Sequence, residues 1–236
     1  MRTHSLGGLT IRMVGGTDGD GGGDGPVVVL LHGYGAPGED LVGLAGELGG
    51  GGSAPARFVF PAAPLSLPPE YGAGRAWWHI DMMRLQLAMA TGQARDLTRD
   101  IPEGLESARE KVIAMLCELR RVLAIGDAPI WLGGFSQGAM LACDVALRSN
   151  EPLCGLALMS GTMLCEEEWL PLMAARAGLR VLVSHGRLDP LLPFSIAERL
   201  RDELARGGAA VTWVPFAGGH GIAPEVLSTL EGLIRG

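Results

Sequence analysis

Short apolar runs alternate with longer stretches of helical character along most of this chain. Runs typical of buried strands cover residues 26–31, 58–60, 129–132, 156–159, 180–184 and 210–216. Helical stretches lie between or after them, at residues 40–48, 101–124, 139–147, 195–207 and 226–234. Strands that alternate with helices in this way predict βαβ units and therefore a mostly parallel sheet. We expect an α/β fold with helices on both faces of a central sheet.

The longest helical stretch, residues 101–124, carries a regular apolar stripe. A helix with such a stripe can pack one face against a sheet while the other face stays in water. Residues 61–78, in contrast, hold too many prolines and glycines for regular structure. The apolar side of the long helix is formed by Leu105, Val112, Met115, Leu116, Leu119 and Val122.

The first 26 residues predict a strand followed by a loop rich in glycine and aspartate. We expect residues 9–14 to form an edge strand and residues 15–25 to form a mobile hairpin or linker loop. The aspartates of this loop suggest a calcium site at first sight. The twelfth position counted from Asp18 is however Val29, so the bidentate acid that such a loop requires is missing. A second flexible loop is expected at residues 49–53.

Length and composition restrict the class of protein. With 236 residues and 47% hydrophobic content, the chain fits one globular domain, which we take as residues 1–236. The net charge is −7 and no basic stripe is present, which argues against nucleic acid as a partner. Because no apolar run approaches 18 residues, we do not expect stable membrane insertion. The sequence leaves open whether the protein forms a homodimer.

The N-terminal residues and the cysteines indicate the compartment. Residues 1–8 lack the continuous apolar region of a signal peptide, so we expect a cytoplasmic protein. The cysteines have no metal-ligand spacing and are interpreted as buried, reduced thiols. We expect neither a metal nor a cofactor. The four cysteines are Cys117, Cys143, Cys154 and Cys165.

The candidate chemistry centres on residues 134–138, which read Gly-Phe-Ser-Gln-Gly directly after an apolar run. A serine hydroxyl is a poor nucleophile unless a sharp strand-to-helix turn aims it and a base takes its proton. Such a turn demands small residues two positions either side of Ser136, where Gly134 and Gly138 stand. In a chain with 37 glycines the pentapeptide alone fits a glycine-rich turn with a solvated serine equally well.

A base and an acid for Ser136 are expected in the chain order serine, acid, histidine. Asp189 follows the strand predicted at residues 180–184, and His220 follows the strand predicted at residues 210–216. In a parallel sheet the loops that follow the strands lie along one edge. We therefore predict that Ser136, Asp189 and His220 meet at that edge.

Other histidines and acids compete for these two roles. We expect His4 to be solvated, His79 to face a pocket and His185 to bond a neighbouring loop, while His32 belongs to the loop after the first core strand. Three acids start a predicted helix, where negative charge suits the helix dipole, and two lie too close to the serine in sequence. These acids are Glu166, Glu167, Glu168, Asp127 and Asp144.

Acyl transfer places negative charge on a carbonyl oxygen, and each preorganised donor there contributes roughly 3–4 kcal/mol. One donor is expected to be the backbone N–H of Gln137, which follows the serine. We assign the second to the backbone N–H of Tyr34, because residues 32–35 follow an early strand. A tight turn that only leads out of a central strand would have the same sequence, so this motif alone does not establish an oxyanion donor.

Several motifs occur together in one known family. A strand followed by His-Gly matches residues 29–33, and Gly-Phe-Ser-Gln-Gly matches residues 134–138 without change. Arg75-Ala76-Trp77 looks like the family's Arg-x-Trp, with an acid nearby at Asp81. From about residue 27 onward the chain closely resembles the phospholipase/carboxylesterase family, which includes the acyl-protein thioesterases. Further matches are Pro-x-Ala-Pro at residues 61–64, Ser-Gly at 160–161, His-Gly-x-x-Asp-Pro at 185–190 and Gly-Gly-His at 218–220.

The resemblance implies a single-domain α/β-hydrolase fold and an esterase or thioesterase without a cofactor. It also implies a catalytic triad of Ser136, Asp189 and His220. Two features depart from the family: Tyr34 stands where the thioesterases usually have leucine, and residues 77–80 are more aromatic than expected. Both favour short acyl groups. We expect the substrate pocket to include Tyr34, Trp77, Trp78 and Leu191.

The leading hypothesis is a serine carboxylesterase that hydrolyses short-acyl esters of small molecules through an acyl-enzyme. The alternative is an acyl-protein thioesterase or lysophospholipase that acts on longer acyl groups. A non-catalytic binding protein of the same fold would be expected to have a broken triad or oxyanion loop, and neither is broken here. A dienelactone hydrolase would use a cysteine in place of Ser136, and a peptidase usually carries an extra domain.

Overall fold

The computed structural model describes residues 1–49, 54–91 and 96–236. Within these residues one large sheet has the strand order β1-β2-β5-β4-β8-β9-β10-β11, with β3 beside β2. The six strands from β5 to β11 in this order run parallel, while β2 pairs antiparallel with both β1 and β5. The strands are β1 (Arg2–Leu6), β2 (Leu9–Gly16), β3 (Asp20–Gly22), β4 (Val27–Leu31), β5 (Arg57–Pro61), β8 (Ile130–Phe135), β9 (Leu153–Met159), β10 (Arg180–Gly186) and β11 (Ala210–Phe216).

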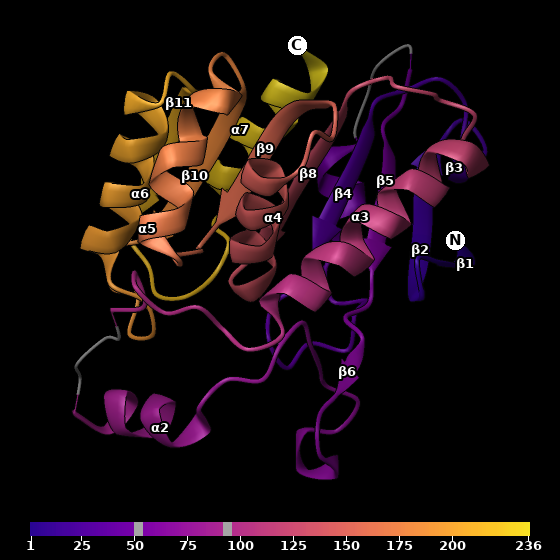
Figure 1. Ribbon diagram of the computed structural model, residues 1–236. Coiled ribbons are helices and arrows are strands. Elements are labelled where there is room, and N and C mark those ends of the chain that lie inside the picture. The colour runs from indigo at the N-terminus through magenta and orange to yellow at the C-terminus, as the bar shows by residue number, and fades with distance from the viewer. Residues whose placement is uncertain (50–53, 92–95) are drawn as a thin grey trace.

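Helices cover both faces of this sheet. Figure 1 shows α3, α4 and α6 on the near side and α7 on the far side, where α7 packs with α1. None of the helices in the described part of the chain has the length and apolarity needed to cross a membrane. The helices are α1 (Leu44–Leu48), α2 (Met82–Thr91), α3 (Leu105–Val122), α4 (Gln137–Arg148), α5 (Glu166–Trp169), α6 (Phe194–Arg206) and α7 (Pro224–Arg235).

The central strands are apolar throughout because both of their faces are covered. In β4 alternate side chains point to opposite faces, so Val27, Val29 and Leu31 pack beneath α3 and α4. Val28 and Leu30 pack on the α1 and α7 side. The predicted α/β architecture, a mostly parallel sheet with helices on both faces, is confirmed, and it has the form of an α/β-hydrolase fold.

The N-terminal region differs from the prediction. Residues 9–14 belong to β2, which lies between β1 and β5, so the edge strand is β1 instead. His4 lies on β1 rather than in solvent, and its Nε2 is buried. The predicted loop contains the short strand β3, and Oδ1 of Asp18 accepts the N–H groups of Asp20 and Gly22 at 2.8 Å each. These backbone hydrogen bonds lower the pKa of Asp18.

Three helix predictions also need correction. Helix α3 begins at Leu105 rather than at residue 101, and Val122, predicted on its apolar side, is 47% exposed. Helix α1 is shorter than predicted, since residues 40–43 form turns. Sequence reasoning missed α2, whose Met83 and Leu87 are 81% and 63% exposed.

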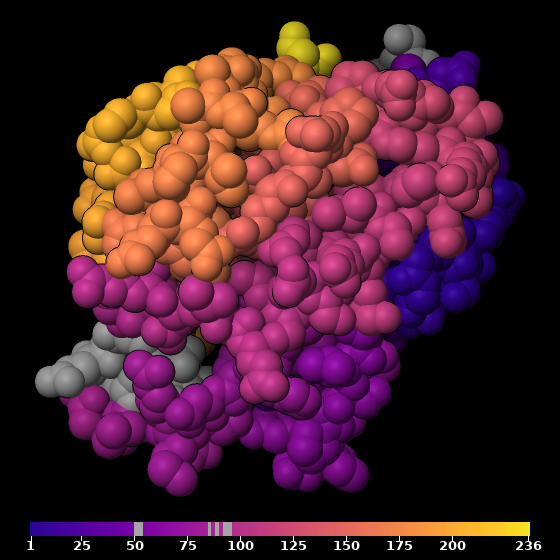
Figure 2. Space-filling view, viewed as in Figure 1, coloured from indigo at the N-terminus to yellow at the C-terminus, as the bar shows by residue number. Residues whose placement is uncertain are grey.

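The connections hold short pieces of regular structure. Residues 61–78 are mainly irregular, as predicted, but include the two-residue strands β6 (Leu65–Ser66) and β7 (Arg75–Ala76) and a 3-10 turn at Pro69–Tyr71. A second 3-10 segment, Leu170–Arg176, follows α5. Figure 2 shows that the segment between β5 and α3 forms the lower part of the molecule in this view. Of the flexible loop predicted at residues 49–53, all but Gly49 lies outside the described residues.

The four cysteines are free, and their burial varies. Cys143 and Cys165 are buried as predicted, Cys154 is half-buried, and Cys117 is exposed on α3. Burial raises the pKa of the Cys143 thiol strongly and raises the pKa of Cys165 to about 11. The prediction of buried thiols is therefore wrong for Cys117.

Candidate active site

Ser136 stands at the sharp turn between β8 and α4, with φ 54° and ψ −117°. A non-glycine residue at positive φ is strained and persists only where the surroundings enforce it. Here the enforcement is steric. A Cβ atom on Gly134 would lie 2.5 Å from Leu31 O, and one on Gly138 would lie 2.1 Å from the same oxygen. Only glycine therefore fits at both positions, as the sequence motif predicted.

The three residues predicted to meet do lie together. His220 Nε2 is 2.8 Å from Ser136 Oγ, and His220 Nδ1 is 2.7 Å from Asp189 Oδ2. Because a carboxylate can only accept, Nδ1 carries the imidazole hydrogen. Nε2 then presents a lone pair to the serine hydroxyl. This arrangement can remove the hydroxyl proton as the serine attacks a carbonyl carbon.

Close contact between the loops after β10 and β11 brings the acid and the histidine together. A Cβ atom on Gly186 would lie 2.1 Å from Gly219 O, so glycine is required there. The N–H of Arg187 donates to Phe216 O, and the N–H of Leu188 donates to Gly218 O, both at 2.9 Å. Backbone hydrogen bonds from the loop that carries Asp189 therefore hold the segment that leads to His220.

Ser160 ties the histidine loop to a third strand. It follows β9, has φ 48°, and its fully buried Oγ donates to Gly221 O at 2.7 Å. Its N–H donates to Ser184 O at 2.9 Å. Sequence reasoning did not assign it a role, although Ser160-Gly161 was among the matched motifs. Like Ser136, Ser160 therefore has a strained, positive-φ backbone, and it lies beside the candidate site.

The carboxylate of Asp189 is buried and heavily hydrogen-bonded. Oδ1 accepts the N–H groups of Leu191 and Leu192 at 2.8 and 3.0 Å. Burial alone would raise the pKa of Asp189, but hydrogen bonds from His185 and His220 outweigh it and hold this pKa far below its usual range. Asp189 is therefore ionised in the pH range where histidines titrate, and it favours a positive charge on His220.

His185 bonds a neighbouring loop, as predicted, since its Nε2 lies 3.1 Å from Leu192 O. The same nitrogen is also 3.2 Å from Asp189 Oδ2, a contact that the sequence did not reveal. His79 lines the cavity described below, while His32 is buried. Burial lowers the pKa of His32, and its Nε2 accepts the N–H of Ala63 at 2.9 Å.

Two backbone N–H groups were predicted to bind the oxyanion. Gln137 occupies the first turn of α4, where free N–H groups and the helix dipole favour negative charge. Gly33, just before Tyr34, lies so close to the serine turn that a Cβ atom on it would be 3.4 Å from Ser136 Cβ. The loop is held by hydrogen bonds from Gly35 N–H to Arg75 O and from Arg75 N–H to Ala36 O. Both candidate donors therefore flank the serine.

The side chain of Gln137 has a second role that the sequence did not indicate. Its Oε1 accepts the N–H of Trp77 at 3.0 Å, and its Nε2 donates to Trp78 O at 2.8 Å. The indole N–H of Trp77 donates to His32 O at 2.9 Å. The tryptophan segment is thus fastened to the serine turn and to the oxyanion loop.

A cavity of about 490 Å³ opens beside Ser136. Tyr34, Trp78 and Leu191 line it, as predicted. Trp77 does not, because its side chain is 1% exposed and packs in the core instead. The remaining apolar walls come mainly from the segment before α3 and from α4, with Asp81, Arg84 and Asp100 as charged groups. These apolar residues include Ile80, Leu97, Ile101, Pro102, Met140 and Leu164.

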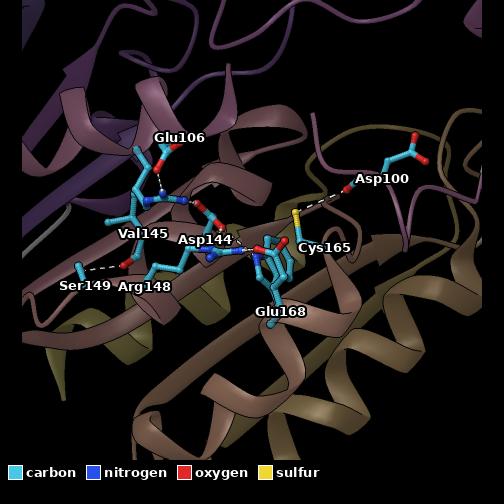
Figure 3. A network of polar contacts seen from close by, with 10 residues as sticks. Asp100, Glu106, Asp144, Val145, Arg148, Ser149, Cys165 and Glu168 are labelled. Atoms are coloured by element: carbon cyan, nitrogen blue, oxygen red, sulfur yellow. Dashed lines mark hydrogen bonds and ion pairs between the residues drawn. The ribbon is translucent and has the colours of Figure 1, made fainter. Parts of the chain in front are cut away.

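A buried carboxylate anchors the helix that carries the serine turn. Asp144 Oδ1 accepts from Arg148 Nε at 2.8 Å and from Trp169 Nε1 at 2.9 Å, and Oδ2 accepts from Arg109 at 2.8 Å. Figure 3 shows this network, in which Arg148 also pairs with Glu168. A buried carboxylate with all of these partners is satisfied. Asp144 therefore joins α4 to α3 and α5 and does not approach Ser136.

The same figure shows how the cavity wall is attached to this region. Cys165 donates through its N–H to Asp100 O at 3.2 Å and approaches the same oxygen through Sγ at 3.5 Å. The N–H of Glu166 donates to Thr98 O at 2.8 Å. Glu166, Glu167 and Glu168 begin α5, as predicted. Within the described residues, no group of three or more histidine, cysteine or acidic side chains is arranged to hold a metal ion.

The chain is similar to known proteins over most of its length. A family model described as Phospholipase/Carboxylesterase matches residues 22–235. Acyl-protein thioesterase 1 of Eremothecium gossypii is 29% identical over 215 residues, which cover 88% of this chain and 86% of that protein. Acyl-protein thioesterase 1 of Gibberella zeae is 32% identical over 186 residues, 76% of each chain.

Solved structures show the same architecture. The crystal structure of esterase PE8 has a TM-score of 0.78 and 30% identity, and the match covers 96% of this chain and 98% of that chain. A carboxylesterase from Mesorhizobium loti has a TM-score of 0.76 at 20% identity and is matched over 100% of both chains. At that identity the second likeness concerns the fold alone.

Proposed function

The chain belongs to the phospholipase/carboxylesterase family, and we propose that it is a serine hydrolase that cleaves carboxylic esters of small molecules. The observation that carries the proposal is the pair of hydrogen bonds that link Ser136, His220 and Asp189. A non-catalytic member of the fold would have no need to keep this geometry. No step of the proposed reaction calls for a metal or a cofactor.

In the acylation step, Ser136 Oγ attacks the carbonyl carbon of the ester while His220 Nε2 takes the hydroxyl proton. The negative charge that develops on the carbonyl oxygen is bound by the backbone N–H groups of Tyr34 and Gln137. Asp189 stabilises the imidazolium and keeps the hydrogen on Nδ1. His220 then returns its proton to the alcohol as the carbon–oxygen bond breaks.

In the deacylation step, water takes the place of the alcohol. His220 removes a proton from the water, and the resulting attack on the acyl-enzyme forms a second tetrahedral intermediate. The same two N–H groups hold its oxyanion. Collapse releases the carboxylic acid and returns the proton from His220 to Ser136, so that atoms and charges balance over the cycle.

The lining of the cavity supports short acyl groups. Tyr34 lines the cavity beside the oxyanion loop, where its ring takes up volume that a smaller side chain would leave open.

A second candidate is a thioesterase or lysophospholipase activity on longer acyl chains. It is favoured by the two relatives named acyl-protein thioesterase 1. The serine chemistry is the same for both bonds, so only the substrate distinguishes the candidates. A thioester carries a better leaving group than an alkyl ester. A long acyl chain would have to extend out of the cavity through its opening.

A matched substrate series tests the proposal. We would measure kcat/KM for p-nitrophenyl esters of acetate, butyrate, hexanoate, decanoate and palmitate, and for butyryl and palmitoyl thioesters of one thiol. Short esters are expected to be the best substrates. Activity confined to palmitoyl thioesters would favour the second candidate, and no hydrolysis of any member would contradict a hydrolase function.

A further inference from the structure

The carboxylate of Asp189 has two histidine neighbours rather than one. His220 donates from Nδ1 to Oδ2 at 2.7 Å, and Nε2 of His185 lies 3.2 Å from the same oxygen. The other carboxylate oxygen already accepts two backbone N–H groups. His185 is fully buried and does not line the cavity. It therefore reaches the candidate site through Asp189 and through the carbonyl of Leu192, which lines the cavity.

The surroundings of His185 determine which ring nitrogen carries the hydrogen. Nε2 faces Leu192 O at 3.1 Å and the Asp189 carboxylate at 3.2 Å, and both of these groups only accept. Nε2 must therefore be the donor. Nδ1 is buried and has no hydrogen-bond partner among the described residues, so a proton there would leave a buried N–H unpaired. The ring hydrogen therefore lies on Nε2, which donates to Leu192 O and lies 3.2 Å from Asp189 Oδ2.

We propose that His185 is a positioning residue, which holds the Asp189 carboxylate toward His220 and weakens the pull of that carboxylate on the His220 proton. The inference rests on the proposed function, since it takes His220 as the base. Oδ2 accepts from His220 Nδ1 and also lies 3.2 Å from the His185 Nε2–H, whose positive end offsets part of the carboxylate charge.

Removal of the His185 N–H would leave the full charge of Oδ2 to His220. An imidazolium beside a fuller negative charge is more stable, so His220 would stay protonated, and inactive as a base, up to a higher pH. The other titratable or charged groups near His220 line the cavity and are unaltered by such a change. These are His79, Asp81, Arg84 and Asp100.

The test is the pH dependence of kcat/KM for p-nitrophenyl butyrate between pH 5 and 9. His185→Leu fills a similar volume without a donor, whereas His185→Gln can present an amide N–H near the position of Nε2. We expect His185→Leu to move the midpoint of the acid limb up by about half a pH unit, a fraction of the one to three units that a full charge produces. His185→Gln should reverse most of this shift, so that its midpoint lies close to that of the wild type.

Ser184→Ala is the matched control. Ser184 is the preceding residue on β10, equally buried, and its Oγ has no hydrogen-bond partner among the described residues. Because its side chain points to the opposite face of the sheet, it does not contact Asp189. The midpoint of this variant should equal that of the wild type.

A folded His185→Leu enzyme with an unmoved midpoint overturns the proposal, as does a loss of activity as deep as that of His220→Ala. If the variant does not fold, nitrogen-15 NMR of the wild-type histidines decides. His185 must carry its hydrogen on Nε2, and a ring with the hydrogen on Nδ1 overturns the proposal. Labelling of wild-type Ser136 by a phosphonate separates the two claims, because its failure contradicts the proposed function itself.

Discussion

Ser136 Oγ and His220 Nε2 lie 2.8 Å apart although the two residues are 84 positions apart in the sequence. The contact follows from crowding in two separate turns. Leu31 O leaves no room for a side chain at Gly134 or Gly138, and Gly186 lets the loop after β11 pass against β10. Because backbone contacts hold both turns, the hydrogen bond between Ser136 and His220 does not depend on substrate. The two side chains therefore need not be ordered during the reaction.

Ser136→Ala should abolish ester hydrolysis while the fold stays intact. Without Oγ no acyl-enzyme can form, so kcat should fall by roughly 10⁴-fold or more. Esterase assays, circular dichroism and urea unfolding would be compared with the wild type. A phosphonate probe should react with Ser136 alone. A folded variant with more than about a tenth of the activity, or an adduct on Ser160 or Ser184, would rule out Ser136 as the nucleophile.

The rate should fall on acidification through the range where histidines titrate, between about pH 5 and 8. A protonated Nε2 on His220 cannot accept the proton of Ser136. The pKa of Asp189 lies far below this range, because its hydrogen bonds from His185 and His220 outweigh burial, so Asp189 cannot cause the fall. Measurement of kcat/KM from pH 4 to 9 checks this. A flat profile above pH 5 would contradict the role of His220.

Gln137→Ala should destabilise the protein and impair the cavity, although the backbone N–H at this position remains. The change leaves the N–H of Trp77 and the carbonyl of Trp78 without partners in a buried place. Each unpaired group costs roughly 1–3 kcal/mol. Urea unfolding would measure the loss, and kcat/KM should fall because Trp78 lines the cavity.

Gln137→Glu is the informative companion. A carboxylate can still accept the N–H of Trp77 but cannot donate to Trp78 O, so this variant should also be destabilised. Wild-type stability in both variants would show that the hydrogen bonds from the Gln137 side chain to Trp77 and Trp78 do not contribute to stability.

The sequence allowed the serine, the acid and the histidine to be placed because each follows a strand of a parallel sheet, whose strand ends share one edge. It did not show that Trp77 turns inward while Trp78 faces the cavity. Adjacent side chains of an extended segment point to opposite sides, so only the surrounding fold decides which one is buried. The contact between His185 and Asp189 was missed for a related reason, since it depends on how one turn folds.

Burial of Cys143 predicts a loss of stability at alkaline pH. Burial raises the pKa of this thiol, whereas in the unfolded chain it titrates near 8.5. Above that pH the unfolded state releases a proton that the folded state keeps, so stability decreases as pH rises. The slope is about 1.4 kcal/mol per pH unit for one thiol.

The free energy of unfolding in urea, measured at pH 7.5 and pH 10 under reducing conditions, tests this prediction. From pH 7.5 to 10 the wild type should lose about 2 kcal/mol more than Cys143→Ala does. Cys117→Ala is the control, because its thiol is exposed and its removal should not alter the pH dependence. Equal slopes for all three proteins would contradict the argument.

Tyr34→Leu should shift the acyl preference toward longer chains. Tyr34 lines the cavity next to the oxyanion loop, so a smaller side chain opens space on the acyl side of the ester. Each methylene that enters apolar surroundings contributes roughly 0.8 kcal/mol, about fourfold in kcat/KM. In the wild type kcat/KM should therefore fall beyond about six carbons, whereas in Tyr34→Leu it should keep rising for several more. Tyr71→Leu is the matched control, because Tyr71 is exposed and does not line the cavity, so its replacement should leave the ranking of esters unchanged. A wild type that prefers palmitoyl over butyryl esters, or a Tyr34→Leu variant with an unchanged ranking, would show that Tyr34 does not set acyl length.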